Sequence, residues 1–297
     1  MGSVCESTTE RTTIGDLRDR FGVDIGSGEA APVTVTSIAD DLQSVTPGAL
    51  FIAGAGVHVS PDLVSAAADR GAYAVLLPTS RKPEFNSLDP DIPVLFGDLT
   101  PTQLSTLAAQ MTGYPANQLA IFTVCGGDSA NCSEALADLL HVLGNPVGLL
   151  SSVGSYSLER DLTYSYPLSG LEVEAMLFAA MEDGATSVVI DASDTTLSDG
   201  ALAGVSVDVC GLLDDVGVSD SPDEAMKRSL ARYGAQISEN THTTTRTHDS
   251  DEVAAENVKD GDGVTVDQLS IGIAMVMQAG IRKSGIRNAL RVIRDFA

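Results

Sequence analysis

The chain has 297 residues, 43% of them hydrophobic and 20% charged, a composition typical of a soluble globular protein. This length is enough for two domains. Acidic residues outnumber basic ones by 41 to 17, which gives a formal net charge of −24. A field of that sign repels phosphate backbones and anionic membrane surfaces, so nucleic acids and lipids are disfavoured as partners.

The sequence shows neither a targeting signal nor a pattern of paired cysteines. The most continuous apolar stretch, residues 269–281, has about 13 residues where a membrane span requires roughly 20. The N-terminal segment lacks the basic and then apolar pattern of a signal peptide. Cys5, Cys125, Cys132 and Cys210 are too sparse for a disulfide framework. We therefore expect a cytoplasmic protein with reduced thiols and no direct membrane insertion.

The first part of the chain alternates short apolar runs with capped helical patterns. Residues 1–30 are polar and acidic, and we expect a flexible lead-in there. Ser60 followed by Pro61 predicts a helix start, and Thr100 with Gln103 forms a capping-box pattern. The expected strands are 50–53, 72–77 and 94–96, and the expected helices are 61–71 and 101–113. Such alternation is typical of a layered α/β domain with parallel strands.

Residues 114–117, Tyr-Pro-Ala-Asn, predict a boundary between a domain at 31–115 and another at 116–297. Beyond it, continuous apolar runs predict buried strands at 119–124, 187–192 and 207–213. Helices are expected at 133–143, after the capping box of Ser169 and Glu172, at 264–279 and from 284 onward. The polar segment 236–263 is expected to be a mobile surface loop. The predicted fold class is α/β, with two layered domains and mainly parallel sheets.

Several of these segments resemble the Mur ligases, the ATP-dependent ligases that build the peptidoglycan stem peptide, and MurE most of all. Residues 46–53, TPGALFIA, resemble the Pro-Gly-Asp-Leu-Phe-Val-Ala signature of the UDP-binding N-terminal domain, and 66–75 resemble its continuation. Residues 150–154, 182–185 and 190–193 fall where the central domain has similar segments. The resemblance implies the family's N-terminal and central domains. No counterpart of the C-terminal domain, which holds the incoming amino acid, is expected.

The family's ATP site is a phosphate loop, Gly-Thr-Asn-Gly-Lys-Thr-Thr, between a strand and a helix. Its backbone N–H groups face the phosphates, its lysine neutralises them, and its threonine holds Mg²⁺. An ungapped alignment from Leu119 to Leu136 puts Ala130 at the lysine and Asn131 at the threonine, and Asp128 adds a negative side chain. One charge-assisted contact is worth about 1.5–3 kcal/mol, so these changes should weaken binding by several powers of ten. We predict a degenerate phosphate loop that binds no ATP, formed by Gly126, Gly127, Asp128, Ser129, Ala130 and Asn131.

The other positions of the family site are changed as well. Residues 190–195, IDASDT, replace Met-Glu-Val-Ser-Ser-His, and only Asp191 is chemically similar. Lys227 aligns with the lysine that the family carbamylates, although a lone helical lysine is usually a solvated surface residue. The uridine-contacting Ser-Arg pair becomes Leu42 and Gln43. The resemblance therefore implies no catalytic residue, no metal and no cofactor here.

Other side chains could carry chemistry, but a structural role is favoured for each. Cys125 and Cys132, with His141, could form a thiol or metal site, although the end of an apolar strand and the first turn of a helix are ordinary structural positions. Ser193 has no histidine base nearby. His242 and His248, with Asp249 and Asp251, could bind a metal weakly. Strand-end carboxylates, which lie where α/β sites form, are Asp191, Asp194, Asp214 and Asp215.

The last sixteen residues carry five cations and one carboxylate, a balance of +4. Their apolar face could close the central domain. Alternatively, the basic face could receive an acidic protein partner or a second copy of the chain. The candidate partner-binding residues are Arg282, Arg287, Arg291 and Arg294.

Taken together, these features predict a MurE-like pseudoenzyme that acts as a binding or regulatory protein in bacterial cell-wall assembly. One alternative is an enzyme with repurposed chemistry in a cleft around Cys125, Asp128, Asp191 and Asp194. Another is a sensor that holds a muropeptide precursor in the N-terminal domain.

Overall fold

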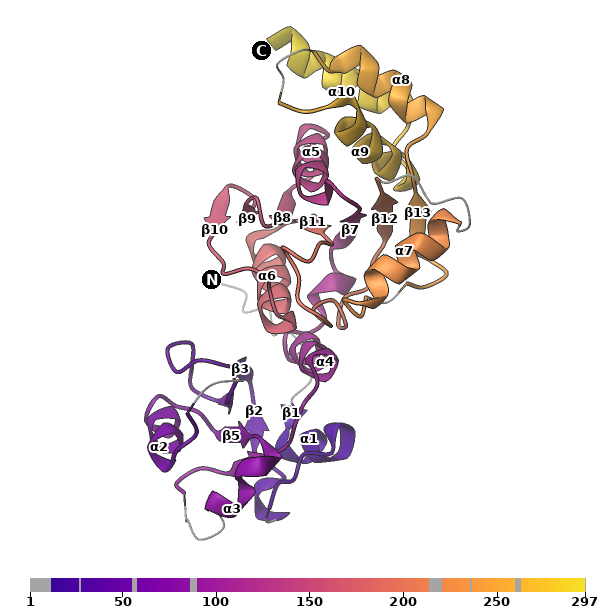
Figure 1. Cartoon of the computed structure of the whole chain (residues 1–297). Coiled ribbons are helices and arrows are strands. Elements are labelled where there is room, and N and C mark those ends of the chain that lie inside the picture. The colour runs from indigo at the N-terminus through magenta and orange to yellow at the C-terminus, as the bar shows by residue number, and fades with distance from the viewer. Residues whose placement is uncertain are drawn as a thin grey trace. The chain divides into compact units, whose positions relative to one another are not determined.

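The computed structural model describes residues 12–26, 28–54, 58–85, 90–213, 221–235, 237–259 and 263–296. The chain forms two compact units, residues 1–113 and 114–297, each with its own hydrophobic core (Figure 1). The division falls beside the predicted boundary at 114–117. Gly113 and Tyr114 both have positive φ angles there, 77° and 55°, directly before Pro115. The structure therefore turns sharply where unit 2 begins.

Unit 1 is built on a parallel sheet with the strand order β3-β4-β5-β6. α1 and α4 pack on one face of this sheet and α2 and α3 on the other. The predicted caps are confirmed: Ser60 accepts from the backbone of Leu63, and Thr100 and Gln103 cap each other. The elements are β1 (Thr12–Thr13), α1 (Ile14–Phe21), β2 (Thr34–Val35), β3 (Ser37–Ala39), β4 (Ala49–Ile52), α2 (Pro61–Asp69), β5 (Ala74–Leu77), α3 (Lys82–Phe85), β6 (Val94–Phe96) and α4 (Pro101–Met111).

The expectation of a flexible lead-in over residues 1–30 is wrong for the part that the structure describes. Thr13 and Asp16 form a capping box at the start of α1. Ile14 and Leu17 are fully buried in the core of unit 1, and the backbone of Asp24 pairs with that of Phe96. Because these two side chains fill the core, the segment must be ordered. Residues 1–11 and 27 lie outside the described residues.

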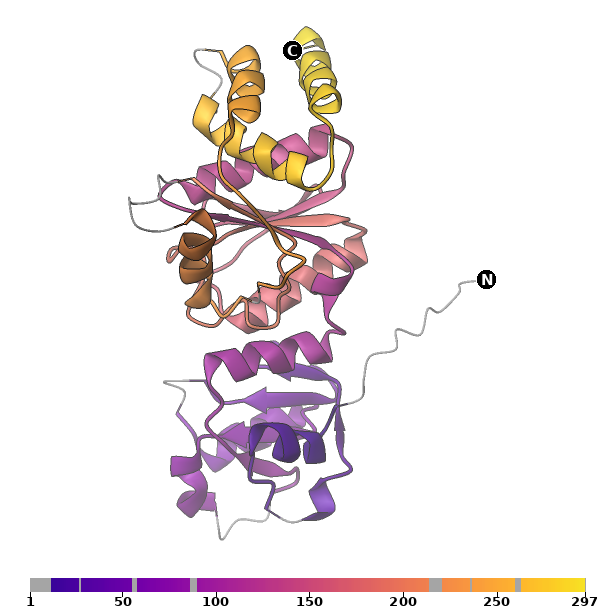
Figure 2. The ribbon, with the colours of Figure 1, turned by 90° about the vertical axis from the view of Figure 1, so that its right-hand side faces the viewer.

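Unit 2 contains a sheet with the strand order β10-β9-β8-β11-β7-β12-β13, parallel except for β9, which is antiparallel to both β8 and β10. Figure 2 shows α5, α8, α9 and α10 on one side of this sheet and α6 and α7 on the other. This confirms the predicted α/β class. The strands are β7 (Ala120–Cys125), β8 (Val147–Leu150), β9 (Ser155–Ser157), β10 (Arg160–Leu162), β11 (Ser187–Asp191), β12 (Val209–Leu212) and β13 (His242–Thr244). The helices are α5 (Ser129–Val142), α6 (Gly170–Asp183), α7 (Pro222–Ala231), α8 (His248–Asn257), α9 (Val266–Gln278) and α10 (Lys283–Phe296).

The prediction of a mobile loop at 236–263 is wrong over most of its described residues. β13 extends the sheet, with His242 opposite Val209. Thr247 caps α8, which buries Val253 and Ala254 in the unit 2 core. The acidic residues of α8 lie mainly on its exposed side, so the segment looks like a loop by composition although it has a buried face. Residues 236 and 260–262 lie outside the described part.

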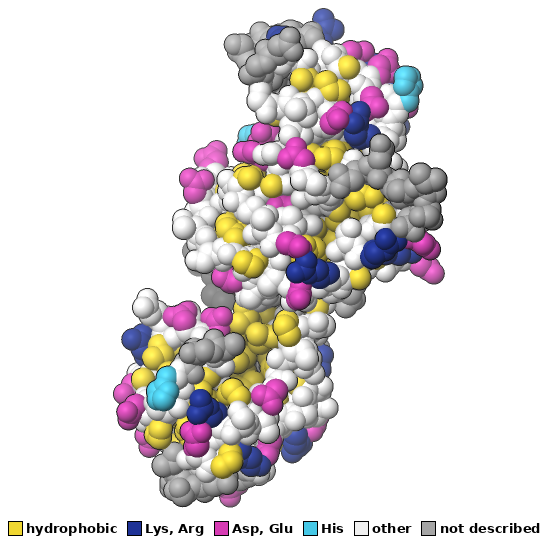
Figure 3. Space-filling view, in the orientation of Figure 1, with side chains coloured by type: hydrophobic (Ala, Val, Ile, Leu, Met, Phe, Trp, Pro, Cys, Tyr) yellow, Lys and Arg dark blue, Asp and Glu magenta, His cyan; other side chains and the backbone are white. Residues whose placement is uncertain are grey.

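The surface is rich in acidic side chains, as the composition predicts. Figure 3 shows carboxylate side chains spread over the visible face of both units. Among the described residues, no helix combines the length and the apolarity that a membrane crossing needs.

Candidate functional site

The predicted phosphate loop lies at the carboxyl edge of the unit 2 sheet. β7 ends at Cys125, and α5 begins at Ser129 rather than at residue 133 as predicted. The turn between them starts at Gly126, whose φ of 121° suits glycine. β7 lies between β11 and β12, with all three strands parallel. Ligands in open α/β sheets bind outside the carboxyl ends of such strands, so this edge is where a ligand of the sheet would be expected.

Asp191, the last residue of β11, is the centre of this edge. Its side chain is fully buried. Ser129 of α5 donates a hydrogen bond of 2.5 Å to its Oδ1, and Ser193 donates one of 2.9 Å to its Oδ2. Thr196 donates another to Oδ2, and the hydroxyl of Ser151, after β8, lies 3.5 Å from the same oxygen. The carboxylate is therefore solvated by hydroxyl groups of the chain itself.

Asp128 is held in the same manner at the start of α5. Asn131 Nδ2 donates to its Oδ1 at 2.7 Å, and Gln268 Nε2 donates to its Oδ2 at 2.6 Å. Gln268 lies in the first turn of α9, where its Oε1 also accepts from the backbone N–H of Thr265 at 2.7 Å. The positive end of α5 thus has a carboxylate of its own chain beside it, and that carboxylate is fixed by two amide side chains.

The fit of ATP and Mg²⁺ to this edge is poor. Residues 126–132, GGDSANC, contain no cation. The side chains that could bind a metal or a phosphate, Ser129, Asn131 and Asp191, already bond to groups of the chain. Mg²⁺ prefers a nearly octahedral set of oxygen ligands with several waters. A buried carboxylate surrounded by hydroxyl donors offers no such opening.

The remaining carboxylates predicted here are engaged or lie elsewhere. Asp194 accepts from the Tyr233 hydroxyl at 2.6 Å and pairs with Arg232 at 2.5 Å. These contacts, that of Tyr233 first, lower the pKa of Asp194. Asp214 and Asp215 lie outside the described residues.

The cysteines do not form an accessible thiol site. Cys125, Cys132 and Cys210 are unoxidised and fully buried, and Cys5 lies outside the described residues. The sulfurs of Cys125 and Cys210 are 3.8 Å apart, and the contact with Cys125, together with burial, raises the pKa of Cys210. His141 is exposed in the last turn of α5, at the opposite end of that helix from Cys132. Among the described residues, Cys125 and Cys132 are therefore not brought together with His141.

The histidines of the 236–263 segment are also separated. His242 belongs to β13 and His248 begins α8. Asp251 bonds to Ser270 and to Arg246, and these contacts, that of Ser270 first, lower its pKa. In the part of the chain that the structure describes, no group of three or more His, Cys, Asp or Glu side chains could hold a metal ion.

The basic C-terminal helix lies against α8, and its first charges are paired within the chain. Lys283 Nζ contacts Asp249 and Glu252, both at 2.7 Å, and Arg287 contacts Glu252 and Glu256 at 2.9 Å. Arg282 and Arg291 are exposed, and the Arg294 side chain lies outside the described residues. Lys227 is exposed on α7.

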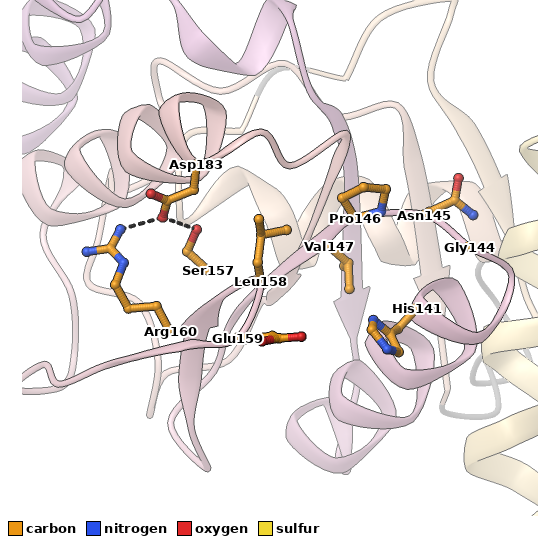
Figure 4. A pocket seen from close by; sticks show the side chains of 10 residues that line it. All are labelled: His141, Gly144, Asn145, Pro146, Val147, Ser157, Leu158, Glu159, Arg160 and Asp183. Atoms are coloured by element: carbon orange, nitrogen blue, oxygen red, sulfur yellow. Dashed lines mark hydrogen bonds and ion pairs between the residues drawn. The ribbon is translucent and has the colours of Figure 1, made fainter.

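Sequence reasoning missed two features of unit 2. One is Glu174 of α6, which is fully buried and whose carboxylate oxygens have no hydrogen-bond partner among the described residues. Burial raises its pKa to about 8. No pattern in the sequence distinguishes this glutamate from an exposed one. The other is a cavity of about 670 Å³ at the amino end of β8 (Figure 4), which no sequence motif marks.

Unit 1 has a hollow of about 450 Å³ at the carboxyl ends of β4, β5 and β6. Backbone and apolar groups around Gly54, Leu77 and Gly97 form most of its wall, and Arg81 and Asp98 are among its polar side chains. Leu42 and Gln43 are not among the residues that line it. The hollow lies where ligands of open parallel sheets bind.

The chain was compared with known proteins, and no family model matches it. It is 30% identical over 183 residues to the UDP-N-acetylmuramyl-tripeptide synthetase of Roseiflexus sp. (strain RS-1), a match covering 59% of this chain and 35% of that protein. It is 26% identical over 178 residues to the UDP-N-acetylmuramoyl-L-alanyl-D-glutamate–2,6-diaminopimelate ligase of Lactiplantibacillus plantarum, with the same coverage. The matches thus span about a third of the length of these relatives.

Solved structures with the same fold cover nearly the whole chain. A UDP-N-acetylmuramoyl-L-alanyl-D-glutamate–2,6-diaminopimelate ligase matches with a TM-score of 0.59 and 13% identity, over 94% of this chain and 66% of that one. MurF from Acinetobacter baumannii matches with a TM-score of 0.54 and 14% identity, over 96% and 68%. At such low identities these structures show a shared fold alone, whereas the sequence matches point to the MurE type. The resemblance is thereby confirmed: this chain shares the fold of the Mur ligases and is MurE-like in sequence over 59% of its length.

Proposed function

We propose that this chain is a catalytically inactive MurE-like pseudoenzyme, located in the cytoplasm, that acts as a binding or regulatory protein in assembly of the bacterial cell wall. The observation that carries the proposal is the loop from Gly126 to Asn131. It keeps the strand, turn and helix of a phosphate loop, but Ala130 stands at the position of the lysine.

The physical argument has two parts. First, a triphosphate at the start of α5 would meet the carboxylate of Asp128 and no cation of the loop, and repulsion replaces attraction. Second, Ser129 and Asn131 would have to break their bonds to Asp191 and Asp128 before they could bind phosphate or metal. Each lost charge-assisted bond costs about 1.5–3 kcal/mol, so affinity falls by several powers of ten.

The test is isothermal titration of the intact chain with ATP and Mg²⁺. We expect no saturable heat at millimolar nucleotide. The double variant Asp128→Asn with Ala130→Lys is the informative companion, because it removes the carboxylate and restores the cation without changing Asp191. We expect it to bind ATP more tightly than the natural chain. Micromolar binding of ATP by the natural chain would overturn the proposal.

A protein partner is the second part of the proposal. Arg282, Arg287, Arg291 and Arg294 are the proposed contact residues, and an acidic protein or a second copy of the chain would suit their charge. The α8 carboxylates already neutralise Arg287, so an acidic partner would compete with them. Capture from the native host with the natural chain and with Arg282→Glu tests this. An unchanged set of partners would remove α10 from the proposal.

The hollow of unit 1 favours a second candidate function, a sensor of a nucleotide-sugar precursor. Arg81 is a cation that could pair with a diphosphate there, and it is partly neutralised by Glu84 at 3.0 Å. A thermal-shift titration with UDP-N-acetylmuramic acid tests this function. We expect stabilisation of the natural chain and less of Arg81→Gln, with Arg18→Gln, outside the hollow, as the control. No stabilisation at millimolar ligand would rule the sensor out.

A further inference from the structure

We infer that the cavity at the amino end of β8 is a binding site for an organic cation, a primary ammonium group on an apolar stem. The cavity has a volume of about 670 Å³, within the range of small-molecule sites. It lies beside Val147, the first residue of β8, whereas the loop of residues 126–131 and Asp191 lie at the carboxyl ends of the strands. It is therefore separate from the site that the fold would suggest.

The floor of the cavity suits the apolar stem. Pro146, Val147 and Leu158 line it, and Figure 4 shows them between the Arg160 side and the His141 side. Leu158 and Glu159 form the two-residue turn between β9 and β10. Leu158 has a φ of 54°, a conformation unusual for leucine, and its N–H donates to the Val147 carbonyl at 3.2 Å. This turn places Glu159 at the cavity, and strained residues of this kind concentrate at functional sites.

The charges of the cavity suit the ammonium group. Asp183 and Arg160 pair with each other at 2.5 Å, and Ser157 also donates to Asp183 at 2.6 Å. These contacts, that of Ser157 first, lower the pKa of Asp183, which stays ionised. Glu159 is exposed and makes no hydrogen bond or ion pair with any described residue. One carboxylate is therefore left without a counter-charge.

Two helix ends add to the negative potential. α5 ends at Val142, and Gly144 and Asn145 after it line the cavity. α6 ends at Asp183, which also lines it. The carboxyl end of a helix carries about half a negative charge and favours cations. An anionic ligand would be opposed by both helix ends, by Glu159 and by the net charge of −24.

The experiment is an NMR titration of the intact, ¹⁵N-labelled chain with pentylammonium, 1-pentanol and pentanoate, which share one stem. We use about 0.15 M salt, where general attraction to an acidic surface is screened beyond about 8 Å. We expect saturable shifts of the amides at 144–147 and 157–160 with pentylammonium. Binding of 1-pentanol should be about two- to fivefold weaker, the factor that one exposed ion pair supplies, and pentanoate should not bind.

Two matched variants distinguish binding at the cavity from general attraction to the acidic surface. Glu159→Gln should weaken the binding of pentylammonium about two- to fivefold and leave that of 1-pentanol unchanged, since only the charge is lost. Glu182→Gln removes an exposed charge beside Asp183 that does not line the cavity, and it should change neither. Equal affinities for the alcohol and the ammonium would overturn the inference. So would shifts scattered over the surface without saturation, or equal effects of the two variants.

A third ligand distinguishes a free amine from the lysine side chain of a protein as the source of the cation. Nα-acetyl-lysine methylamide carries the same ammonium group on a peptide backbone. Binding as tight as that of pentylammonium would identify the lysine side chain of a protein as an occupant. Binding at least tenfold weaker would identify a free amine, because the peptide groups then fail to fit the cavity.

Discussion

The carboxylates at the two edges of the unit 2 sheet differ in burial and in hydrogen bonding. At the carboxyl edge, Asp191 is buried and accepts from Ser129, Ser193 and Thr196. At the amino edge, Glu159 is exposed beside an open cavity and has no partner among the described residues. At the edge where ligands of open parallel sheets bind, the described side chains of Ser129 and Asn131 bond to groups of the chain, and at the other edge a cavity is open.

This difference indicates that a shared backbone geometry does not by itself establish a binding site. A chain can keep the strand, turn and helix of a phosphate loop while its side chains satisfy one another instead of a ligand. At the carboxyl edge, the carboxylates of Asp191 and Asp128 accept hydrogen bonds from side chains of the same chain. A concave, mostly apolar pocket with a few polar groups marks a candidate binding site more directly than the position of a loop in the fold. The comparison can be tested by substituting buried and exposed polar residues of unit 2.

The largest effect is expected from Asp191→Ala. The substitution leaves the buried hydroxyls of Ser129 and Thr196 without an acceptor, and each unsatisfied group costs about 1–3 kcal/mol. We expect a loss of about 3–5 kcal/mol in the free energy of unfolding by urea. Asp194→Ala is the control, because Asp194 is exposed and its loss should lower the free energy of unfolding far less. A loss below about 1 kcal/mol for Asp191→Ala would show that the hydroxyl cluster contributes little to stability.

The second prediction concerns Glu174, a buried carboxylate that has no donors, unlike Asp191. Burial raises its pKa in the folded chain to about 8, above the ordinary value of 4.5, so folding favours its protonated form. The stability that this protonation provides is complete below pH 4.5 and is lost as pH rises to about 8. Glu174→Gln removes that dependence and should stabilise the chain by about 3 kcal/mol at pH 7, since one pKa unit is worth about 1.4 kcal/mol.

The measurement for Glu174 is urea unfolding between pH 5 and 9. The gain of Glu174→Gln over the natural chain should grow with pH and level off above about pH 8. Glu182→Gln, an exposed change on the same helix, should be neutral throughout. A gain that is the same at every pH would contradict the burial of an ionisable Glu174.

Local signals in the sequence predict much of the fold. Capping residues such as Ser60 and Thr100, and the apolar runs of β7 and β11, mark elements through contacts within a few residues. The failures have a common cause. At α1 and at α8, a few buried residues such as Ile14 and Val253 fix an element whose exposed residues are mostly polar. Composition averages the two faces and so predicts disorder.

The candidate site was predictable in its composition but not in its contacts. Ala130 and Asp128 can be read directly from the loop. That Gln268 holds Asp128 could not be foreseen, because 140 residues separate the two and no pattern links them. The same holds for Lys283 and Asp249, 34 residues apart. The cavity beside β8 depends on where the hairpin and two helix ends meet, which only the tertiary structure determines.

A third, smaller effect is expected from Gln268→Ala. It removes a hydrogen bond to the Asp128 carboxylate and half of the α9 capping box. We expect a loss of about 1–2 kcal/mol on unfolding. Hydrogen exchange of the amides at 127–131 should also become faster, because the loop loses its link to α9. Gln278→Ala, at the exposed end of the same helix, should change neither quantity. An unchanged loop in Gln268→Ala would mean that α9 does not hold it.

The smallest effect is expected at the surface, where charges are paired but solvated. Arg287→Met removes exposed ion pairs with Glu252 and Glu256 and should lower the free energy of unfolding slightly at low salt. Near 1 M salt, where the screening length is about 3 Å, most of this cost should disappear. Arg282→Met is the control, since none of the described residues pairs with Arg282. A loss that persists at high salt would show that the Arg287 side chain contributes through packing rather than charge, and an acidic partner could then not displace α8 by charge alone.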